Sequence, residues 1–326
     1  MTTLPSSLQQ LPVGGKALPA ANGLPQQVRP VVGPRAQAWK RRLPLLPALV
    51  YIVVVTQIPF IVTLWYSFRR WNLLIPGSNQ FAGLAEYRAA FENPMFREAA
   101  WRTVEMTASS VVLAMLLGTG LAILVNRQFF GRGIVRTLLI TPFLIMPVAT
   151  DLLFKTTLYD ATFGLLDWVL KPLGVGQVNW TGTHAVGSIV AVLVWEWAPF
   201  MMLIVLAGLQ GENLEALEAA KVDGASSLKT FVYITFPQLR RYIQLGVLLG
   251  SIYIVQTFGE IFVITAGGPG TSTTNLPYFL YEQVFDNFTV GIGAAAGIIV
   301  LVLTEIVAGF ALKLLSGILT ASAAMA

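Results

Sequence analysis

Residues 45–66 read LLPALVYIVVVTQIPFIVTLWY and contain no charged residue. A helix needs roughly 20 apolar residues to cross the hydrocarbon core of a bilayer, which is about 30 Å thick. The stretch therefore predicts a transmembrane helix. The whole chain agrees, because 55% of its 326 residues are hydrophobic and only 11% are charged, whereas a soluble domain carries about 25% charged residues. We therefore expect an integral membrane protein.

Five more apolar windows follow the first. They are residues 101–125, 134–158, 185–209, 242–265 and 290–315. The third window has the shortest uncharged stretch, because Arg136, Asp151 and Lys155 interrupt it. Prolines lie inside the third and fourth windows, and we expect them to kink a membrane helix rather than prevent it. Gly246 and Gly250 have the spacing that lets helices approach closely, although this spacing also arises by chance in glycine-rich helices.

The positive charges set the orientation of these helices. With the N-terminus in the cytoplasm, the inner segments hold 14 Lys and Arg and the outer segments hold 7. Cytoplasmic segments carry the excess in membrane proteins, so we expect both termini inside. Arg69 and Arg70, directly after the first window, are the main signal against this orientation.

The two ends of the chain differ from the apolar windows. Residues 1–42 are rich in Pro, Gly, Gln and Ala, show no helical or strand period and end in the basic run Trp39–Arg42. We expect a disordered cytoplasmic tail there, a six-helix domain over residues 43–316 and a cytoplasmic C-terminal tail over residues 317–326.

Residue counts exclude several kinds of chemistry. The chain has no cysteine and one histidine, His184. Disulfides, cysteine nucleophiles and clustered-histidine metal sites are therefore excluded. The sequence G-x-x-x-x-G-K-[ST], which cradles nucleotide phosphates, is absent, so we do not expect this chain to hydrolyse ATP by itself. The net charge of +5 is explained by membrane orientation, and we expect no nucleic-acid partner.

One long inner segment, residues 210–241, is polar, and it reads QGENLEALEAAKVDGASSLKTFVYITFPQLRR. Asn213 can cap a short helix that runs to about Val222. The Asp223–Gly224 pair predicts a turn, since glycine tolerates a left-handed backbone. Ser226 or Ser227 can cap a second helix through Ile234, which Pro237 should end. From the residues alone, this helix–turn–helix either docks into a partner or rests on lipid.

Two motifs resemble one family. The first motif consists of Glu218, Ala219, Ala220, Asp223, Gly224 and Ala225, and Phe231, Ile234 and Pro237 follow it. This motif resembles the EAA loop of binding-protein-dependent ABC importer permeases. The second motif, Thr265–Pro269 with Thr271 and Thr274, resembles the outer loop of the carbohydrate subgroup related to maltose permeases. The family often has a proline before the first helix of the EAA loop, where this chain has Gly211–Asn213.

The resemblance implies a complex and a fold. The fold would be all-α, the ABC importer type I permease fold with six transmembrane helices in a bacterial inner membrane. The partners would be a second permease, two copies of a cytoplasmic ATPase, an extracytoplasmic solute-binding protein and membrane lipid. The six residues of the first motif would couple to the ATPase, namely Glu218, Ala219, Ala220, Asp223, Gly224 and Ala225. Gly267, Gly268 and Pro269 would face the binding protein. ATP and Mg would be used by the partner ATPase, so this chain would be a transport subunit without a cofactor rather than an enzyme.

Acidic residues inside the windows are candidates for a substrate path, because a charge in the bilayer usually faces protein, water or a ligand. Asp151 has Lys155 one helical turn away, and we expect the two to pair. Glu196 lies between two tryptophans, and Glu260 follows several polar and aromatic residues. A ligand with many hydroxyls needs hydrogen-bonding groups and aromatic faces together. The predicted path is therefore Trp195, Glu196, Tyr253, Gln256 and Glu260. The alternative is that the tryptophans face lipid or an interface.

The substrate class remains open between several sugars. Residues 250–262 and Asn275–Tyr278 resemble members that transport polyols such as sorbitol or mannitol, and mono- or disaccharides are the alternatives. Two other functions compete with the importer. An ion-coupled secondary transporter would typically show inverted repeats, and we find none. A membrane-embedded transferase would need an acidic metal motif or a basic phosphate site, and neither is evident.

Overall fold

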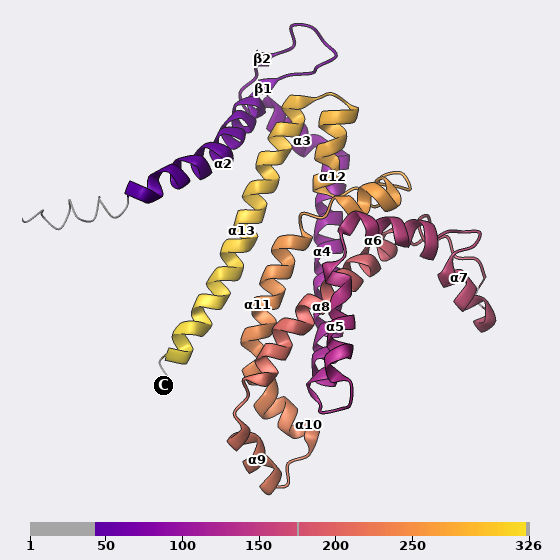
Figure 1. The fold of residues 1–326 in the computed structure, drawn as a ribbon. Coiled ribbons are helices and arrows are strands. Elements are labelled where there is room, and N and C mark those ends of the chain that lie inside the picture. Colours follow the sequence, from indigo (N-terminus) through magenta and orange to yellow (C-terminus); the bar gives the residue numbers. More distant parts are fainter. Residues whose placement is uncertain (1–42, 175, 324–326) are drawn as a thin grey trace, which may run out of the picture. The chain divides into compact units, whose positions relative to one another are not determined.

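The computed structural model describes residues 43–174 and 176–323 (Figure 1). The tail predicted over residues 1–42 lies outside this part. The chain divides into two compact units, Met1–Thr56 and Gln57–Ala326. In the first unit, the described residues form a short 3-10 helix, η1 (Leu43–Leu45), and the first turns of α2 (Leu46–Ser67).

The described chain is mainly helical, as predicted, and its strands are limited to one antiparallel hairpin that pairs Arg69 with Phe81. The strands are β1 (Arg69–Arg70) and β2 (Gln80–Phe81). After α2 the α-helices are α3 (Ala85–Glu92), α4 (Pro94–Asn126), α5 (Arg132–Leu144), α6 (Pro147–Leu153), α7 (Leu165–Leu170), α8 (Ala185–Gln210), α9 (Leu214–Val222), α10 (Ser227–Thr230), α11 (Phe236–Ile254), α12 (Leu276–Tyr281) and α13 (Val290–Ala323). A further 3-10 helix is η3 (Lys171–Leu173), and the π-helices are η2 (Phe154–Leu158), η4 (Phe231–Thr235), η5 (Ile261–Thr265) and η6 (Glu282–Asp286).

The predicted windows each fall on helical segments. Among the described residues, α2, α4 and α8 are long and apolar enough to cross a membrane, and the bent pair α5–α6 could be a fourth span. In α13, residues Val290–Ile306 form a shorter apolar stretch. The number of six spans therefore stays a prediction, as do the domain boundaries. The α13 helix continues past residue 316, where we expected the C-terminal tail to begin.

The third window is broken. The axes of α5 and the segment Pro147–Leu158 differ in direction by 94°. Ile145 and Met146, between the two helices, have extended backbone angles. A residue before a proline avoids the helical region, so Pro147 accounts for this conformation at Met146. Proline itself is tolerated at the first position of the next helix, where its missing N–H has no helical partner. The fifth window is interrupted too, since α11 ends at Ile254 and η5 begins at Ile261.

The α8 helix lies at the centre of the packing, against α4, α5 and α11. Its side chains Ile189, Leu193 and Met201 are completely buried. At Gly118 of α4, a Cβ atom would lie 2.6 Å from the Met201 Cβ and 2.8 Å from the Ala198 carbonyl oxygen. Only glycine lets the two helices approach this closely. The predicted close packing at Gly246 and Gly250 is also confirmed, since a Cβ at either would meet a methionine methyl group at 2.4 Å or less.

The two arginines that oppose the charge bias have local partners. Arg69 donates to the Asn79 carbonyl oxygen at 3.0 Å and lies over the Trp65 ring. Arg70 pairs with the buried carboxylate of Glu86 at 3.2 Å. These contacts give both residues a structural role on the segment between α2 and α3. This role does not depend on the orientation of the helices in the membrane.

Candidate functional site

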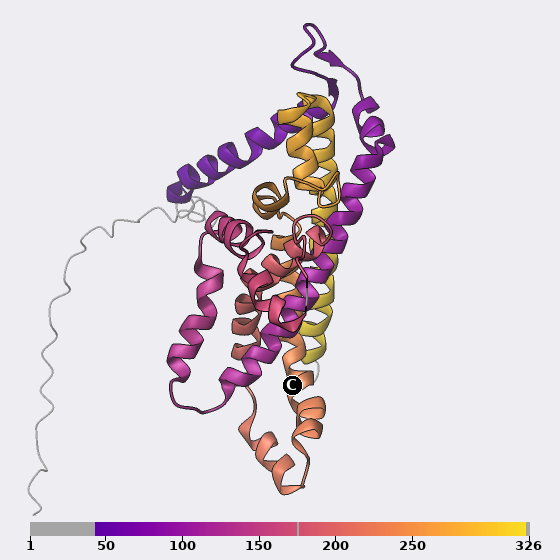
Figure 2. The ribbon, with the colours of Figure 1, turned by 90° about the vertical axis from the view of Figure 1, so that its right-hand side faces the viewer.

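The polar segment after α8 folds into a hairpin of α9 and α10, here called the α9–α10 hairpin (residues 211–235). It projects at one end of α8 and α11 (Figures 1 and 2). Asn213 caps α9 by accepting from the Glu215 N–H at 2.9 Å, and α9 ends at Val222, both as predicted. Gly224 has φ of +72°, the left-handed conformation that favours glycine. The Ala225 N–H donates back to the Ala220 carbonyl oxygen at 2.9 Å and closes the turn.

The second half of the hairpin agrees with one prediction and contradicts another. Ser226, one of the two predicted caps, is the N-cap, since its hydroxyl accepts from the Lys229 N–H at 3.4 Å. The prediction that Pro237 ends this helix was wrong: α10, η4 and α11 follow one another without a break, and Pro237 lies in the first turn of α11. Proline lacks an N–H and would break a regular α-helix there. The π-turn η4 directly before it changes the hydrogen-bond spacing, so the chain stays helical.

The predicted coupling residues divide between two faces of the hairpin. Ala220 is buried, whereas Glu218, Ala219, Asp223 and Gly224 are exposed. The hairpin is also fixed to the helices above it, since the Gln238 side chain donates to the Gly211 carbonyl oxygen at 2.8 Å. Its outer surface carries exposed apolar side chains, among them Leu214, Val222, Leu228 and Tyr233. Exposed apolar residues gathered on a polar segment are typical of a protein-binding surface.

The second motif forms a tight loop after η5. Gly267 has φ of +78°, and a Cβ there would lie 2.6 Å from the Tyr278 ring, so no other residue fits. Gly267 is buried, Gly268 is half-buried and Pro269 is exposed. Three buried residues, Thr273, Thr274 and Asn275, hold the loop from inside. Burial raises the pKa of the Tyr278 hydroxyl, and the carboxylates of Glu282 and Asp286 raise it further.

Asn275 is a residue whose role the sequence did not reveal. Its side-chain N–H donates to the Thr257 carbonyl oxygen at 2.6 Å, and its oxygen caps α12 by accepting from the Tyr278 N–H at 3.0 Å. Thr257 lies in the break between α11 and η5. Asn275 therefore connects the outer loop with the interrupted fifth window. A cap at the start of a short helix was a possible signal for it, but its second partner is distant in sequence.

The predicted pair of Asp151 and Lys155 is not formed. Lys155 instead donates to the Val263 carbonyl oxygen at 2.6 Å. Asp151 is fully buried, and neither carboxylate oxygen has a hydrogen-bond partner among the described residues. Glu196 and Glu260 are also buried, and the three carboxyl groups are close enough to interact electrostatically. The structure thus brings together two predicted path residues and adds Asp151 to them.

The aromatic residues of the predicted path separate. The Trp195 ring lies 5.4 Å from Phe154, whereas Trp197 stacks on Tyr253 with 5.5 Å between ring centroids. Both tryptophans are half-buried and pack against the hydrophobic core. Successive helical residues point about 100° apart, so two positions along a helix reverse most of a side chain's direction. Tyr253 and Gln256 are exposed on the described chain. Trp197 is therefore the tryptophan that accompanies the predicted path residue Tyr253, and a role of Trp195 in the path stays a prediction.

The family follows from a comparison with known proteins. The family model described as "Binding-protein-dependent transport system inner membrane component" matches residues 97–318. The chain belongs to this family. The match covers the helices from α4 to α13, and therefore both the α9–α10 hairpin and the outer loop.

Two curated relatives of the permease have names that describe sugar transport systems. A trehalose/maltose transport system permease protein of Thermococcus litoralis is 34% identical over 80% of this chain and 88% of its own length. A sulfoquinovosyl glycerol transport system permease protein of Agrobacterium fabrum is 30% identical over 83% of this chain and 88% of its own. Among solved structures, a chain of a bacterial ABC transporter that imports alginate has a TM-score of 0.75 and 21% identity, over 86% of this chain and 96% of its own. This likeness confirms the ABC importer permease fold.

Proposed function

We propose that this permease is one of two membrane subunits of an ATP-driven importer for a neutral sugar or sugar alcohol. The ATPase would be two copies of a separate chain, and an extracytoplasmic solute-binding protein would deliver the ligand. A solved relative of the fold is an alginate transporter in complex with its ligand-bound periplasmic protein. The observation that carries the proposal is the rigid, capped α9–α10 hairpin with its exposed apolar residues, which bears the EAA motif.

The proposed orientation places the α9–α10 hairpin and both termini in the cytoplasm. The exposed side of the hairpin, with Glu218 and Asp223, would contact the ATPase. Ala220 would fix the contact surface from within, since it is buried against the permease. Pro269 and the half-buried Gly268 would face the binding protein on the other side of the membrane, and the buried Gly267 would hold the loop in its conformation. The EAA motif on the α9–α10 hairpin favours the ATPase over lipid, which is the alternative partner of an amphipathic helix.

The proposed substrate path combines exposed and buried groups. Tyr253 and Gln256 would contact the ligand directly, and Trp197 would support Tyr253 by stacking. Glu196 and Glu260 would accept hydrogen bonds from ligand hydroxyls that come within reach during the transport cycle. Loss of one such hydrogen-bond partner costs about 1 to 3 kcal/mol, which weakens transport about 5- to 150-fold if binding limits it. We favour a polyol over a mono- or disaccharide from the resemblance of residues 250–262 and Asn275–Tyr278.

A transport assay tests the function. Proteoliposomes would contain the two permeases with the ATPase facing the lumen, and the binding protein would be added outside. We expect accumulation of labelled sugar only with ATP inside, and no change with an ionophore. Uptake that needs an ion gradient and no ATP would establish the alternative, a secondary transporter. A hydrolysis-deficient ATPase is the matched control for ATP binding without turnover.

The path is tested by substitutions in the same assay. Glu196→Gln, Gln256→Ala and Trp197→Ala should reduce uptake while the complex still assembles. Trp195→Ala should reduce uptake less than Trp197→Ala, because the Trp195 ring packs on Phe154 rather than on the path residue Tyr253. Normal uptake by the first three variants at all ligand concentrations would place the ligand path elsewhere, most simply in the partner permease.

A further inference from the structure

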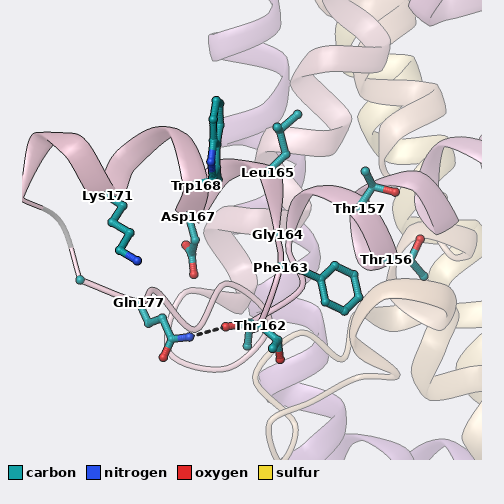
Figure 3. A pocket seen from close by; sticks show the side chains of 12 residues that line it. Thr156, Thr157, Thr162, Phe163, Gly164, Leu165, Asp167, Trp168, Lys171 and Gln177 are labelled. Carbon is teal, nitrogen blue, oxygen red and sulfur yellow. Dashed lines mark hydrogen bonds between the residues drawn. The ribbon is translucent and has the colours of Figure 1, made fainter.

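A pocket of about 680 Å³ lies on the segment between η2 and α8, around α7 (Figure 3). This segment precedes the start of α8, whereas the α9–α10 hairpin follows its end. The 26 residues of α8 make a helix about 39 Å long at 1.5 Å per residue. The pocket and the hairpin are therefore at opposite ends of α8, and the pocket faces the outside in the proposed orientation. Small-molecule sites typically enclose about 300 to 1,000 Å³, so the size suits a small ligand.

The polar groups of the pocket are held in place by the protein and keep free bonding capacity. Asp167 accepts from the Trp180 indole N–H at 2.8 Å. The Gln177 amide donates to the Ala161 carbonyl oxygen at 2.7 Å (Figure 3). A carboxylate has about four acceptor sites and an amide oxygen has two, so both side chains can still accept from a ligand. Groups fixed before binding lose little conformational entropy when the ligand arrives.

The charges of the pocket favour a neutral ligand. Lys171 and Asp167 both line the cavity (Figure 3). Among the residues that the structure describes, none accepts a hydrogen bond from the Lys171 ammonium group or pairs with it. One positive and one negative group give no net attraction for an ion. They do supply strong donors and acceptors for hydroxyl groups, to which the hydroxyls of Thr157 and Thr162 add.

Two aromatic residues of the pocket are exposed. Trp168 is 72% exposed and Phe163 is 74% exposed, and both line the cavity. Neither ring belongs to a buried core cluster of the described residues, so both rings are accessible to a ligand. Aromatic faces pack well on the C–H surface of a sugar, while fixed polar groups orient its hydroxyls.

We propose that the α7 pocket binds a neutral, hydroxyl-rich sugar or sugar alcohol on the outer side of the membrane. It is a second ligand site in this chain, distinct from the path between α8 and α11, and it receives the ligand before the ligand enters that path. The inference rests on the proposed function, since it uses the orientation of the permease and the class of its substrate. The mixed lining of rings, hydroxyls and opposite charges distinguishes it from a purely apolar protein-docking groove.

Cysteine protection tests the site, because the natural chain contains no cysteine. Thr162→Cys would report on the pocket, and Asn79→Cys, exposed on the segment between α2 and α3, would be the control. The assembled importer in lipid nanodiscs, without binding protein, would react with a water-soluble maleimide in the presence of mannitol, sorbitol, maltose or trehalose. We expect at least one of these four compounds to slow labelling at position 162 about tenfold, when the compound is present at ten times its dissociation constant. The reason is that only the ligand-free pocket reacts. Labelling at position 79 should not change.

A second substitution locates the ligand. Trp168→Ala should abolish the protection, whereas Trp168→Phe should keep part of it. Val169→Ala, an exposed neighbour on α7 that does not line the pocket, should have no effect. Protection that survives Trp168→Ala would overturn the assignment of the pocket. Sugar-free binding protein that slows labelling at position 162 would overturn it too, and would identify a docking surface for that protein.

Uptake of the same four compounds by the importer separates the two proposals. If one compound is imported in an ATP-dependent manner but none protects position 162, the α7 pocket is not a sugar site and the proposed function stands. If none is imported while the importer assembles and hydrolyses ATP, the proposed substrate class fails and this inference fails with it.

Discussion

Gly224→Val should uncouple the permease from its ATPase without unfolding it. Gly224 has φ of +72°, and an added Cβ would meet no atom within 4 Å. The substitution therefore introduces backbone strain but no steric clash. A β-branched residue in the left-handed region costs about 1 to 3 kcal/mol, which lowers the population of the correct turn about 5- to 150-fold. We expect the permease to reach the membrane and the ATPase to bind weakly or to lose its response to the binding protein.

The chain offers a matched control for this strain. Gly77 has φ of +76° and also has nothing within 4 Å of an added Cβ, but it lies between α2 and α3 rather than in the α9–α10 hairpin. Gly77→Val should carry a similar strain and leave coupling intact. Gly224→Asn should restore most of the activity, because asparagine tolerates the left-handed conformation. The assay is ATP hydrolysis by the reconstituted importer with and without ligand-loaded binding protein. Equal stimulation in Gly224→Val and the parent would refute the role of the hairpin turn.

Three further predictions concern topology and packing. Single cysteines at Lys229 and Thr271 should be labelled from the cytoplasmic and the outer side, respectively; labelling of both from one side would reject the orientation. Asn275→Ala should lower stability by about 1 to 3 kcal/mol, because it leaves the buried Thr257 carbonyl oxygen without its side-chain donor; an unchanged thermal unfolding curve in detergent would contradict this. Gly118→Leu should prevent assembly of α4 against α8, since even a Cβ there would lie 2.8 Å from α8 backbone atoms. The control is Gly120→Leu, because an added Cβ at Gly120 meets no atom within 4 Å. A stable Gly118→Leu permease would show that the helices can move apart.

Local chemistry explains which parts of the fold the sequence predicted. The α9 helix and its turn depend on Asn213 and Gly224, whose conformations are set within a few residues of themselves. Apolar windows predicted where helices lie, because a membrane selects length and composition. The extended Met146 is also local in origin, since Pro147 restricts it, but the resulting angle of 94° depends on what the two helices pack against.

One incorrect prediction involves partners that are far apart in the chain. Lys155 was expected to pair with Asp151 on its own helix, but its acceptor is the Val263 carbonyl oxygen, 108 positions away. That carbonyl is in the π-helix η5, which no sequence pattern indicated. Trp195 and Trp197 look equivalent beside Glu196, and only the packing of α8 against Phe154 and Tyr253 tells them apart. Side-chain direction on a buried helix therefore needed the tertiary structure.

The central claim is that the permease has different partners on the two sides of the membrane, the ATPase at the α9–α10 hairpin and the binding protein at the outer loop. A photo-crosslinking amino acid at position 218, where the glutamate is exposed, and another at position 271 test this directly in the assembled importer. We predict that position 218 captures only the ATPase and that position 271 captures only the binding protein, with identification by mass spectrometry. Capture of the binding protein from position 218, or of the ATPase from position 271, would contradict the account.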